Sequence, residues 1–243
     1  MSELGRAIDE LVLANRILAH EGIFDAFGHV SIRHPNDPGK YLLSRSRSPE
    51  LVKQEDILEF TLDNRLVGDV KAKVYLERFI HGAIYEANPE IGAVVHSHAV
   101  EVLPFGISSV PLRPVIHCAS QCGAHIPVWD ISDKFGDTGL LVVNQEQGRD
   151  LAKCMGHGRV ALMRGHGFAA AGRTVAEALK VSIYLPRNAR VLMDAVRLGG
   201  DVKYLSQGEI AVREGHGPGG AEIARAMEYW ARRAGCEHLL KHD

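Results

Sequence analysis

A short apolar segment that ends in two histidines constrains the fold of this chain more than any other feature. The run from Ile91 to Val95 has the composition of a buried β-strand, and His96 and His98 follow it directly. Because side chains alternate along a strand, the two imidazoles leave the strand end on one side and can meet one metal ion. A helical pattern over Val74 to Ala87 precedes this strand and stops at Asn88-Pro89, so helix and strand are expected to be neighbours in the fold.

Helical and strand patterns alternate along the rest of the chain in the manner of an α/β domain. Turn residues at 34–39 and 63–64 follow strand patterns, so we expect hairpins and an at least partly antiparallel sheet. No internal repeat or Gly/Ser linker divides the 243 residues, and a single domain over 1–243 is expected. Helices are expected over 3–20, 146–155, 174–198 and 221–233, and strands over 27–33, 41–43, 57–62, 126–128, 140–143, 160–163 and 168–171.

The composition excludes several classes of partner. The chain has 46% apolar and 24% charged residues, which is ordinary for a globular core, and its net charge is −2. It has no run of basic residues, which argues against nucleic acid or an anionic membrane, so a small molecule is the expected ligand. The sequence shows no signal peptide and no apolar run of about 20 residues, and a cytoplasmic location is expected. The four cysteines are too irregularly spaced for a disulfide framework.

Two further residues could complete a metal site. His166 lies between two glycines at a predicted turn, where glycine allows the backbone to aim the imidazole into a cavity. Three imidazoles with open positions are a common arrangement for a catalytic divalent ion. Glu77, in the first turn of the predicted 74–87 helix, could be a fourth ligand or an acid/base. The competing interpretations are polar histidines at a strand end and a solvated glutamate favoured by the helix dipole.

Four motifs in order resemble the class II aldolase/adducin family, from the first helix to about Arg190. They are Gly28-His29-Val30-Ser31, Glu77 at a helix start, the segment 93–98 and Leu162-Met163-Arg164-Gly165-His166-Gly167. The resemblance implies an α/β/α sandwich around a mixed, largely antiparallel sheet. It also implies a divalent metal on His96, His98 and His166, a catalytic Glu77, and a homo-oligomer, commonly a tetramer with sites at subunit interfaces.

The chain departs from this family where sugar-phosphate aldolases bind phosphate. His29 stands where those enzymes have Asn, the Thr/Ser-Gly loop is replaced by Ser44-Arg45-Ser46-Arg47, and Val74, Tyr75 and Leu76 stand where they have serines before the glutamate. A guanidinium group matches a carboxylate through two parallel hydrogen bonds and stacks on rings, so these changes favour a flat, carboxylated aromatic substrate. The substrate-binding candidates are His29, Ser44, Arg45, Arg47 and His117, against a solvated basic loop and a core histidine as the alternatives.

The segments 43–51, 75–82 and 111–114 are most similar to the aromatic decarboxylase branch of the family, which acts on hydroxyphthalates and a hydroxymethylpyridine dicarboxylate. The resemblance implies a carboxy-lyase of aromatic catabolism that uses Mn²⁺, Zn²⁺, Co²⁺ or Fe²⁺ for non-oxidative decarboxylation of a hydroxylated aromatic or pyridine (di)carboxylate. Alternatives are a lyase on a non-phosphorylated hydroxy-acid or sugar and a non-haem iron oxygenase. An adducin-like interaction module without chemistry is disfavoured because all three histidines are present.

Overall fold

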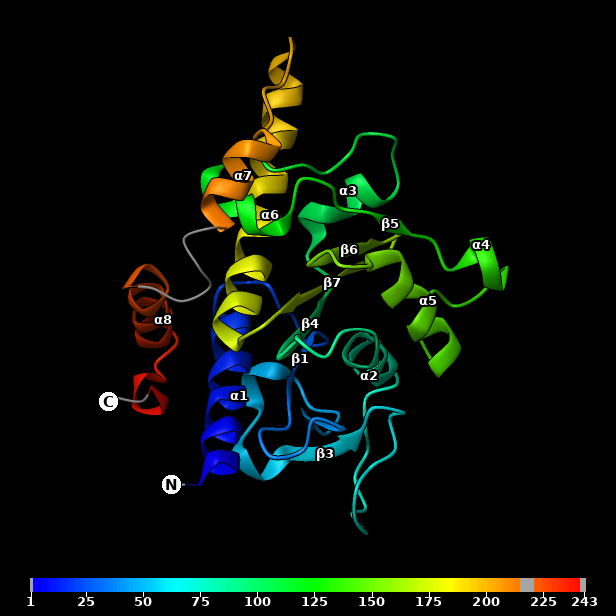
Figure 1. The fold of residues 1–243 in the computed structure, drawn as a ribbon, viewed down its shortest axis with the longest axis vertical. Coiled ribbons are helices and arrows are strands. Elements are labelled where there is room, and N and C mark those ends of the chain that lie inside the picture. Colours follow the sequence, from blue (N-terminus) through cyan, green and yellow to red (C-terminus); the bar gives the residue numbers. More distant parts are fainter. Residues whose placement is uncertain (1, 215–220, 241–243) are drawn as a thin grey trace.

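A seven-stranded sheet forms the centre of the protein (Figure 1). The computed structural model describes residues 2–214 and 221–240. The strands lie in the order β3-β2-β1-β4-β7-β6-β5, and every neighbouring pair is antiparallel except β5 and β6. Their bounds are β1 His29–Arg33, β2 Lys40–Ser44, β3 Ile57–Thr61, β4 Ala93–Ser97, β5 Val128–Trp129, β6 Val160–Met163 and β7 Gly167–Gly172.

Helices cover both faces of the sheet. One core contains residues of α1 (Glu3–His20) and α6 (Val175–Leu198), and the other contains residues of α2 (Arg78–Ala87) and α5 (Gln145–Met155). The predicted α/β/α sandwich around a largely antiparallel sheet is therefore confirmed. Among the described residues, no helix has the length and apolar character that crossing a membrane requires. The remaining helices are α3 Leu103–Gly106, α4 Ser132–Phe135, α7 Gln207–Glu214 and α8 Ala221–Arg233, with 3₁₀ turns at 49–51, 54–56, 100–102, 117–122 and 237–239.

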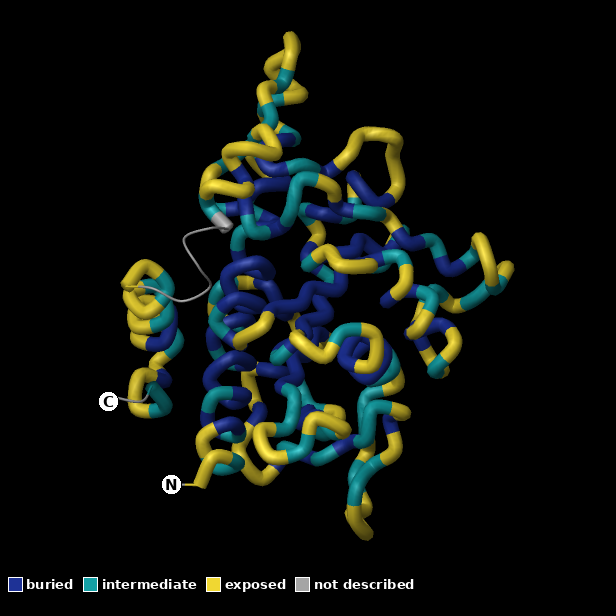
Figure 2. Tube along the Cα trace, viewed as in Figure 1, coloured by how far each residue is buried: buried dark blue, intermediate teal, exposed yellow. Residues whose placement is uncertain are grey.

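Strand β4 lies at the centre of the sheet and is buried along its whole length (Figure 2). Ala93 and Val95 belong to the core that includes α1 and α6, and Val94 belongs to the core with α2 and α5. Side chains alternate between faces along a strand, so His96 shares the face of Val94. The alternation therefore directs His96 toward α2, the helix that Glu77 precedes.

Two sequence predictions about local structure are wrong. The helix expected from Val74 begins only at Arg78, because the backbone N–H of Ser46 donates to the Lys73 carbonyl at 2.8 Å and holds the preceding segment beside the 44–48 loop. Glu77 thus lies at the helix N-cap position and not in its first turn. The residues 140–143 form no strand, because Leu140 has a φ of 62° and Val142 donates its N–H to the Glu77 side chain.

Candidate metal centre

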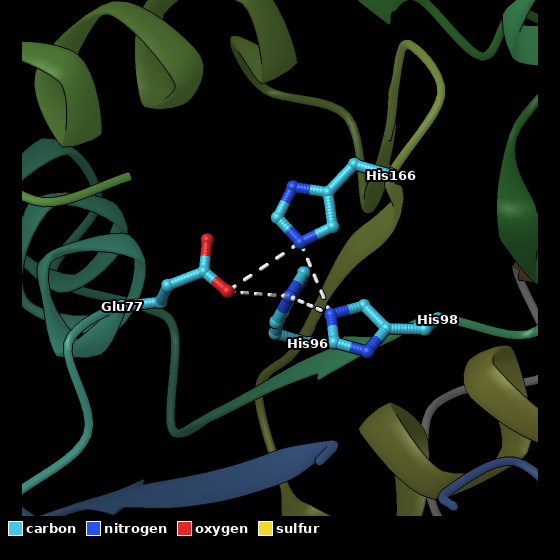
Figure 3. Close-up of side chains that lie close together, drawn as sticks. All are labelled: Glu77, His96, His98 and His166. Atoms are coloured by element: carbon cyan, nitrogen blue, oxygen red, sulfur yellow. Dashed lines mark hydrogen bonds and ion pairs between the residues drawn. The ribbon is translucent and has the colours of Figure 1, made fainter. Parts of the chain in front are cut away.

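Four side chains from separate parts of the chain converge at one end of the central strands (Figure 3). Nε2 of His98 lies 3.0 Å from Nε2 of His96 and 3.0 Å from Nε2 of His166. Glu77 Oε2 lies 3.5 Å from His96 Nε2 and 3.4 Å from His166 Nε2. One ligand atom from each residue falls within 4.8 Å of all the others, so the structure brings together the four residues predicted as a metal site, hereafter the His–Glu cluster.

The turn between β6 and β7 carries His166 to this position. In the β4–β7 ladder Ser97 is paired with Phe168, which places the turn beside the residues that follow β4. Gly165 has a φ of 65°, a conformation that favours glycine. At Gly167 a Cβ atom would lie 2.0 Å from the Ser97 carbonyl oxygen, so only glycine allows the two backbones to approach this closely.

Backbone carbonyls fix the tautomers of two imidazoles. His96 donates its Nδ1 proton to the Phe168 carbonyl at 3.0 Å, and His166 donates its Nδ1 proton to the Leu140 carbonyl at 2.9 Å. A carbonyl oxygen can only accept, so in the neutral rings both Nε2 atoms keep a lone pair. Lone pairs of imidazoles and a carboxylate oxygen thus face one another at short distance, and a divalent cation is the group that fits such a donor set.

The charge states of the cluster also suit a cation. Burial, reinforced by the neighbouring His96 and His166, lowers the pKa of His98 to about 4, so this imidazole is neutral near pH 7. Burial of Glu77 acts to raise its pKa, but the charges and hydrogen bonds that His96 and His166 supply when protonated outweigh it and hold the pKa far below the usual range. Glu77 Oε1 also accepts the N–H of Val142 at 3.0 Å. Neutral imidazoles and an ionised carboxylate are the forms that bind metals.

A cavity of about 470 Å³ opens onto the His–Glu cluster at Glu77 and His98. Its wall is largely apolar, and Phe27 and Leu76 remain 66% and 63% exposed there. Two of the predicted substrate-binding residues, His29 and Arg47, line the same cavity. The cluster is therefore joined to a space with one guanidinium group and an apolar, partly aromatic surface.

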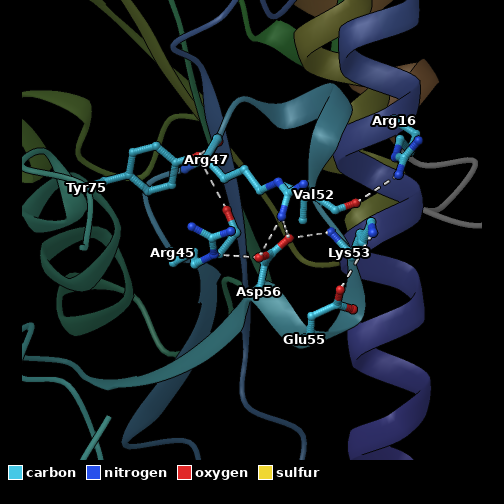
Figure 4. A network of polar contacts seen from close by, with 9 residues as sticks. Arg16, Arg45, Arg47, Val52, Lys53, Glu55, Asp56 and Tyr75 are labelled. Carbon is cyan, nitrogen blue, oxygen red and sulfur yellow. Dashed lines mark hydrogen bonds and ion pairs between the residues drawn. The ribbon is translucent and has the colours of Figure 1, made fainter. Parts of the chain in front are cut away.

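The arginine-rich loop is tied to a buried carboxylate (Figure 4). Arg45 Nε lies 2.6 Å from Asp56 Oδ1, and Arg47 Nη1 lies 3.1 Å from Asp56 Oδ2. Burial acts to raise the pKa of Asp56, but the hydrogen bonds from Arg45, the Lys53 backbone and Arg47 outweigh it and lower the pKa. Tyr75 donates its hydroxyl proton to the Arg47 carbonyl. This network holds the loop in place beside the cavity, a role that the sequence did not reveal.

Like Arg45, the remaining predicted substrate-binding residues, Ser44 and His117, do not line this cavity. Ser44 is buried at the end of β2, and its Oγ lies 3.4 Å from the Tyr75 hydroxyl, so it supports the cavity wall. His117 lies in the 3₁₀ turn at 117–122 and lines a separate cavity of about 530 Å³ with residues of α6 and α8, including Lys180 and Trp230. Within the described part of one chain, the structure does not bring His117 to the His–Glu cluster.

Sequence reasoning missed a buried polar chain behind His29. Nδ1 of His29 lies 2.6 Å from Nε2 of His81, Nδ1 of His81 lies 2.7 Å from Ser31 Oγ, and this oxygen lies 2.9 Å from the Tyr85 hydroxyl. His29 and Ser31 are two residues apart on β1 and so lie on the same face of the strand. His81 and Tyr85 are four residues apart on α2 and so lie on the same face of the helix. These two spacings were the available signal. Strand pairing then sets His29 directly opposite His96.

The α/β/α sandwich described above is also the fold of class II aldolases of known structure. Residues 9–193 match the model of the Class II Aldolase and Adducin N-terminal domain, and the chain belongs to this family.

Relatives with known names narrow the reaction type. The chain is 37% identical over 188 residues to the decarboxylase tropJ of Talaromyces stipitatus, covering 72% of this chain and 71% of that protein. It is 30% identical over 219 residues to a 3,4-dihydroxyphthalate decarboxylase of Arthrobacter keyseri, covering 84% and 85%. The structure of L-fuculose 1-phosphate aldolase from Glaciozyma antarctica superposes with a TM-score of 0.75 at 19% identity, over 96% of this chain and 92% of that one. These relatives support an enzyme with a lyase-type reaction, of the decarboxylase or aldolase kind.

Proposed function

We propose that the protein is a metal-dependent, non-oxidative decarboxylase of a hydroxylated aromatic or pyridine (di)carboxylate. The observation that carries the proposal is the junction of the His–Glu cluster with a cavity that has apolar walls and Arg47 at its edge. A flat ring matches the apolar walls, and a guanidinium group matches a ring carboxylate. Two relatives bear the name decarboxylase, one of them for 3,4-dihydroxyphthalate.

In this proposal His96, His98 and His166 hold the divalent ion, with Glu77 beside it. The ion, when bound, supplies a Lewis acid for the oxygens next to the breaking bond. Imidazoles bind Mn²⁺, Zn²⁺, Co²⁺ and Fe²⁺, so the relative affinities of these ions for the site and their concentrations in the cell decide which ion is bound.

Glu77 is the proposed acid/base. Val142 fixes Oε1 of the carboxylate, so Oε2, which faces His96 and His166 in the cluster, is the oxygen that accepts the proton of the ring hydroxyl next to the carboxylate that leaves. The carbon–carbon bond then breaks, its electron pair stays on the ring carbon, and CO₂ departs. Glu77 returns the proton to that carbon to form the new C–H bond, and the phenolate regains a proton from solvent.

Arg47 and His29 are the proposed substrate-binding residues. Arg47 binds a carboxylate that remains on the ring, while Asp56 and Tyr75 hold the arginine and its loop in place. His29 faces the same cavity, next to the cluster. Ser44 and Arg45 support the loop, and His117 contributes only in an oligomer that brings it from a second subunit, as in the homotetramer we propose.

The test is CO₂ release from a panel of ortho-hydroxy aromatic and pyridine dicarboxylates. Protein stripped by a chelator should be inactive, and Mn²⁺, Zn²⁺, Co²⁺ and Fe²⁺ should restore activity to different extents. Full activity of the stripped protein would contradict the proposal. Release of an aldehyde would identify an aldolase-type lyase, and O₂ consumption would identify an oxygenase.

A further inference from the structure

The polar chain behind His29 leads from the cavity into the core between β1 and α2. It consists of His29, His81, Ser31 and Tyr85, all buried. His29 is the member that lines the cavity. Its Nδ1 is engaged by His81, so Nε2 is the ring nitrogen left for a substrate.

The far end of the chain determines the direction of its hydrogen bonds. Among the described residues, Ser31 Oγ is the acceptor within hydrogen-bonding distance of the Tyr85 proton. A buried hydroxyl proton without an acceptor is unfavourable, so Tyr85 donates to Ser31.

Each later member of the chain then has one satisfactory orientation. Ser31 accepts from Tyr85 and donates its own proton to His81 Nδ1. His81 therefore carries its proton on Nε2 and donates it to His29 Nδ1. His29 in turn must carry its proton on Nε2.

We propose that Tyr85, Ser31 and His81 are positioning residues that fix His29 as a neutral hydrogen-bond donor, with its Nε2–H directed to an oxygen of the substrate. The inference rests on the proposed function for the nature of that oxygen, a carboxylate or hydroxyl group of the aromatic acid. The inference gives the polar chain a role in substrate binding. It also leaves Glu77, and not His29, as the residue that accepts the proton of the substrate's ring hydroxyl.

The polar chain of Tyr85, Ser31 and His81 orients His29 and does not conduct protons. Burial lowers the pKa of His81 to about 3, reinforced by His96, so this link stays neutral. Burial raises the pKa of Tyr85 well above its ordinary value, so the tyrosine at the far end of the polar chain does not release its proton. A donor fixed in this way binds an anionic oxygen without adding a positive charge beside the metal ligands.

The tautomer of His29 can be measured directly by ¹⁵N NMR on zinc-loaded, ¹⁵N-histidine-labelled protein, with the signals assigned through His29→Asn. Wild-type His29 should show a protonated Nε2 and an unprotonated Nδ1. In Ser31→Ala the orientation is lost, and the two nitrogen shifts should move toward each other, with a smaller change in Tyr85→Phe. Tyr41→Phe is the matched control, because Tyr41 is equally buried, its ring centroid is 5.5 Å from that of Tyr85, and its hydroxyl donates to Asn64 at 2.6 Å outside the chain.

Kinetics provide the second readout. Ser31→Ala should raise KM for the aromatic acid about fivefold while kcat changes less than about twofold, as expected when one binding hydrogen bond is weakened. A wild-type His29 protonated on Nδ1, or ¹⁵N shifts unchanged by Ser31→Ala, would overturn the inference. If the shifts behave as expected but no substrate releases CO₂, the orienting chain stands and the proposed function fails.

Discussion

Glu77 and His166 are joined twice, directly and through the segment 140–142. Glu77 Oε2 lies 3.4 Å from His166 Nε2, while Val142 donates to Glu77 and Leu140 accepts from His166. The segment 140–142 forms no strand, and its backbone N–H and carbonyl groups instead hold the Glu77 carboxylate and the His166 imidazole in position. Both residues are held before any metal or substrate arrives, which is the property expected of a preorganised site.

Glu77→Gln should lower kcat for CO₂ release by about 10²- to 10⁴-fold, because the amide cannot carry the proton between hydroxyl and ring carbon. Three imidazoles remain, so metal content should stay near that of the wild type. Glu86→Gln is the matched control on α2, since within the described part of the chain Glu86 pairs with Arg149 and Gln145 at the surface. Metal loss in Glu77→Gln would show instead that the carboxylate is required as a ligand.

Arg47→Gln and Arg45→Gln should separate substrate binding from loop support. Each removes one hydrogen bond to buried Asp56 and should lower the free energy of unfolding by about 1–2 kcal/mol in urea titrations. Arg47 also lines the cavity, so only its variant should raise KM, by about 10- to 100-fold, the cost of one charged hydrogen bond or pair. Equal KM values in the two variants would argue against Arg47 as the carboxylate-binding residue.

The metal-free protein should lose stability as the pH falls from about 6.5, the ordinary pKa of histidine. Folding lowers the pKa of His81 to about 3 and of His98 to about 4, so the unfolded chain takes up protons that the folded chain refuses. His81 alone should cost about 2 kcal/mol between pH 7.5 and 5.0, and the partly exposed His98 less. His81→Gln should show a correspondingly smaller difference between urea titrations at the two pH values; an unchanged difference would rule out this origin.

Gly167→Ala should destabilise the protein by about 3 kcal/mol and weaken metal uptake, because its Cβ would meet the Ser97 carbonyl oxygen at 2.0 Å. Thermal unfolding and Co²⁺ titration measure the two effects. Gly139→Ala is the control, since no atom lies within 4 Å of the added Cβ and no unusual φ is required there. If Gly167→Ala bound Co²⁺ like the wild type, the close approach of the two backbones would not be needed for the cluster.

Local patterns in the sequence predicted an α/β domain with a partly antiparallel sheet and four candidate residues for a metal site, while the resemblance to the family implied the α/β/α sandwich and the ligand set. The apolar alternation of β4 sets His96 on the side of α2, and the Gly-His-Gly turn returns the chain to the same strand end. Local sequence patterns did not predict that α2 begins at Arg78 or that residues 140–143 form no strand. Their backbone groups bind partners distant in sequence, and such contacts override local propensity.

The substrate side of the site was less predictable. Arg45 and Arg47 were predicted as substrate-binding residues, with a solvated basic loop as the alternative, and nothing in their spacing indicated that Asp56 would bind both. The chain behind His29 depends on the register of β1 with β4 and on the packing of α2, which are properties of the tertiary structure. His117 was predicted together with these residues, with a core histidine as the alternative, and the single chain places it in another cavity.

The His–Glu cluster depends on the register of the β4–β7 ladder, so metal binding by the cluster can report on the pairing of these two strands during refolding. His96 is paired with Ala169 and Ser97 with Phe168, so a slip of one residue would turn alternate side chains to the opposite face and move His166 away from its partners. Capture of Co²⁺, with its visible absorption, would then report the moment at which these two strands reach native alignment. If the cluster binds Co²⁺ as proposed, the added ion would be an optical probe of refolding placed at the end of the central strands.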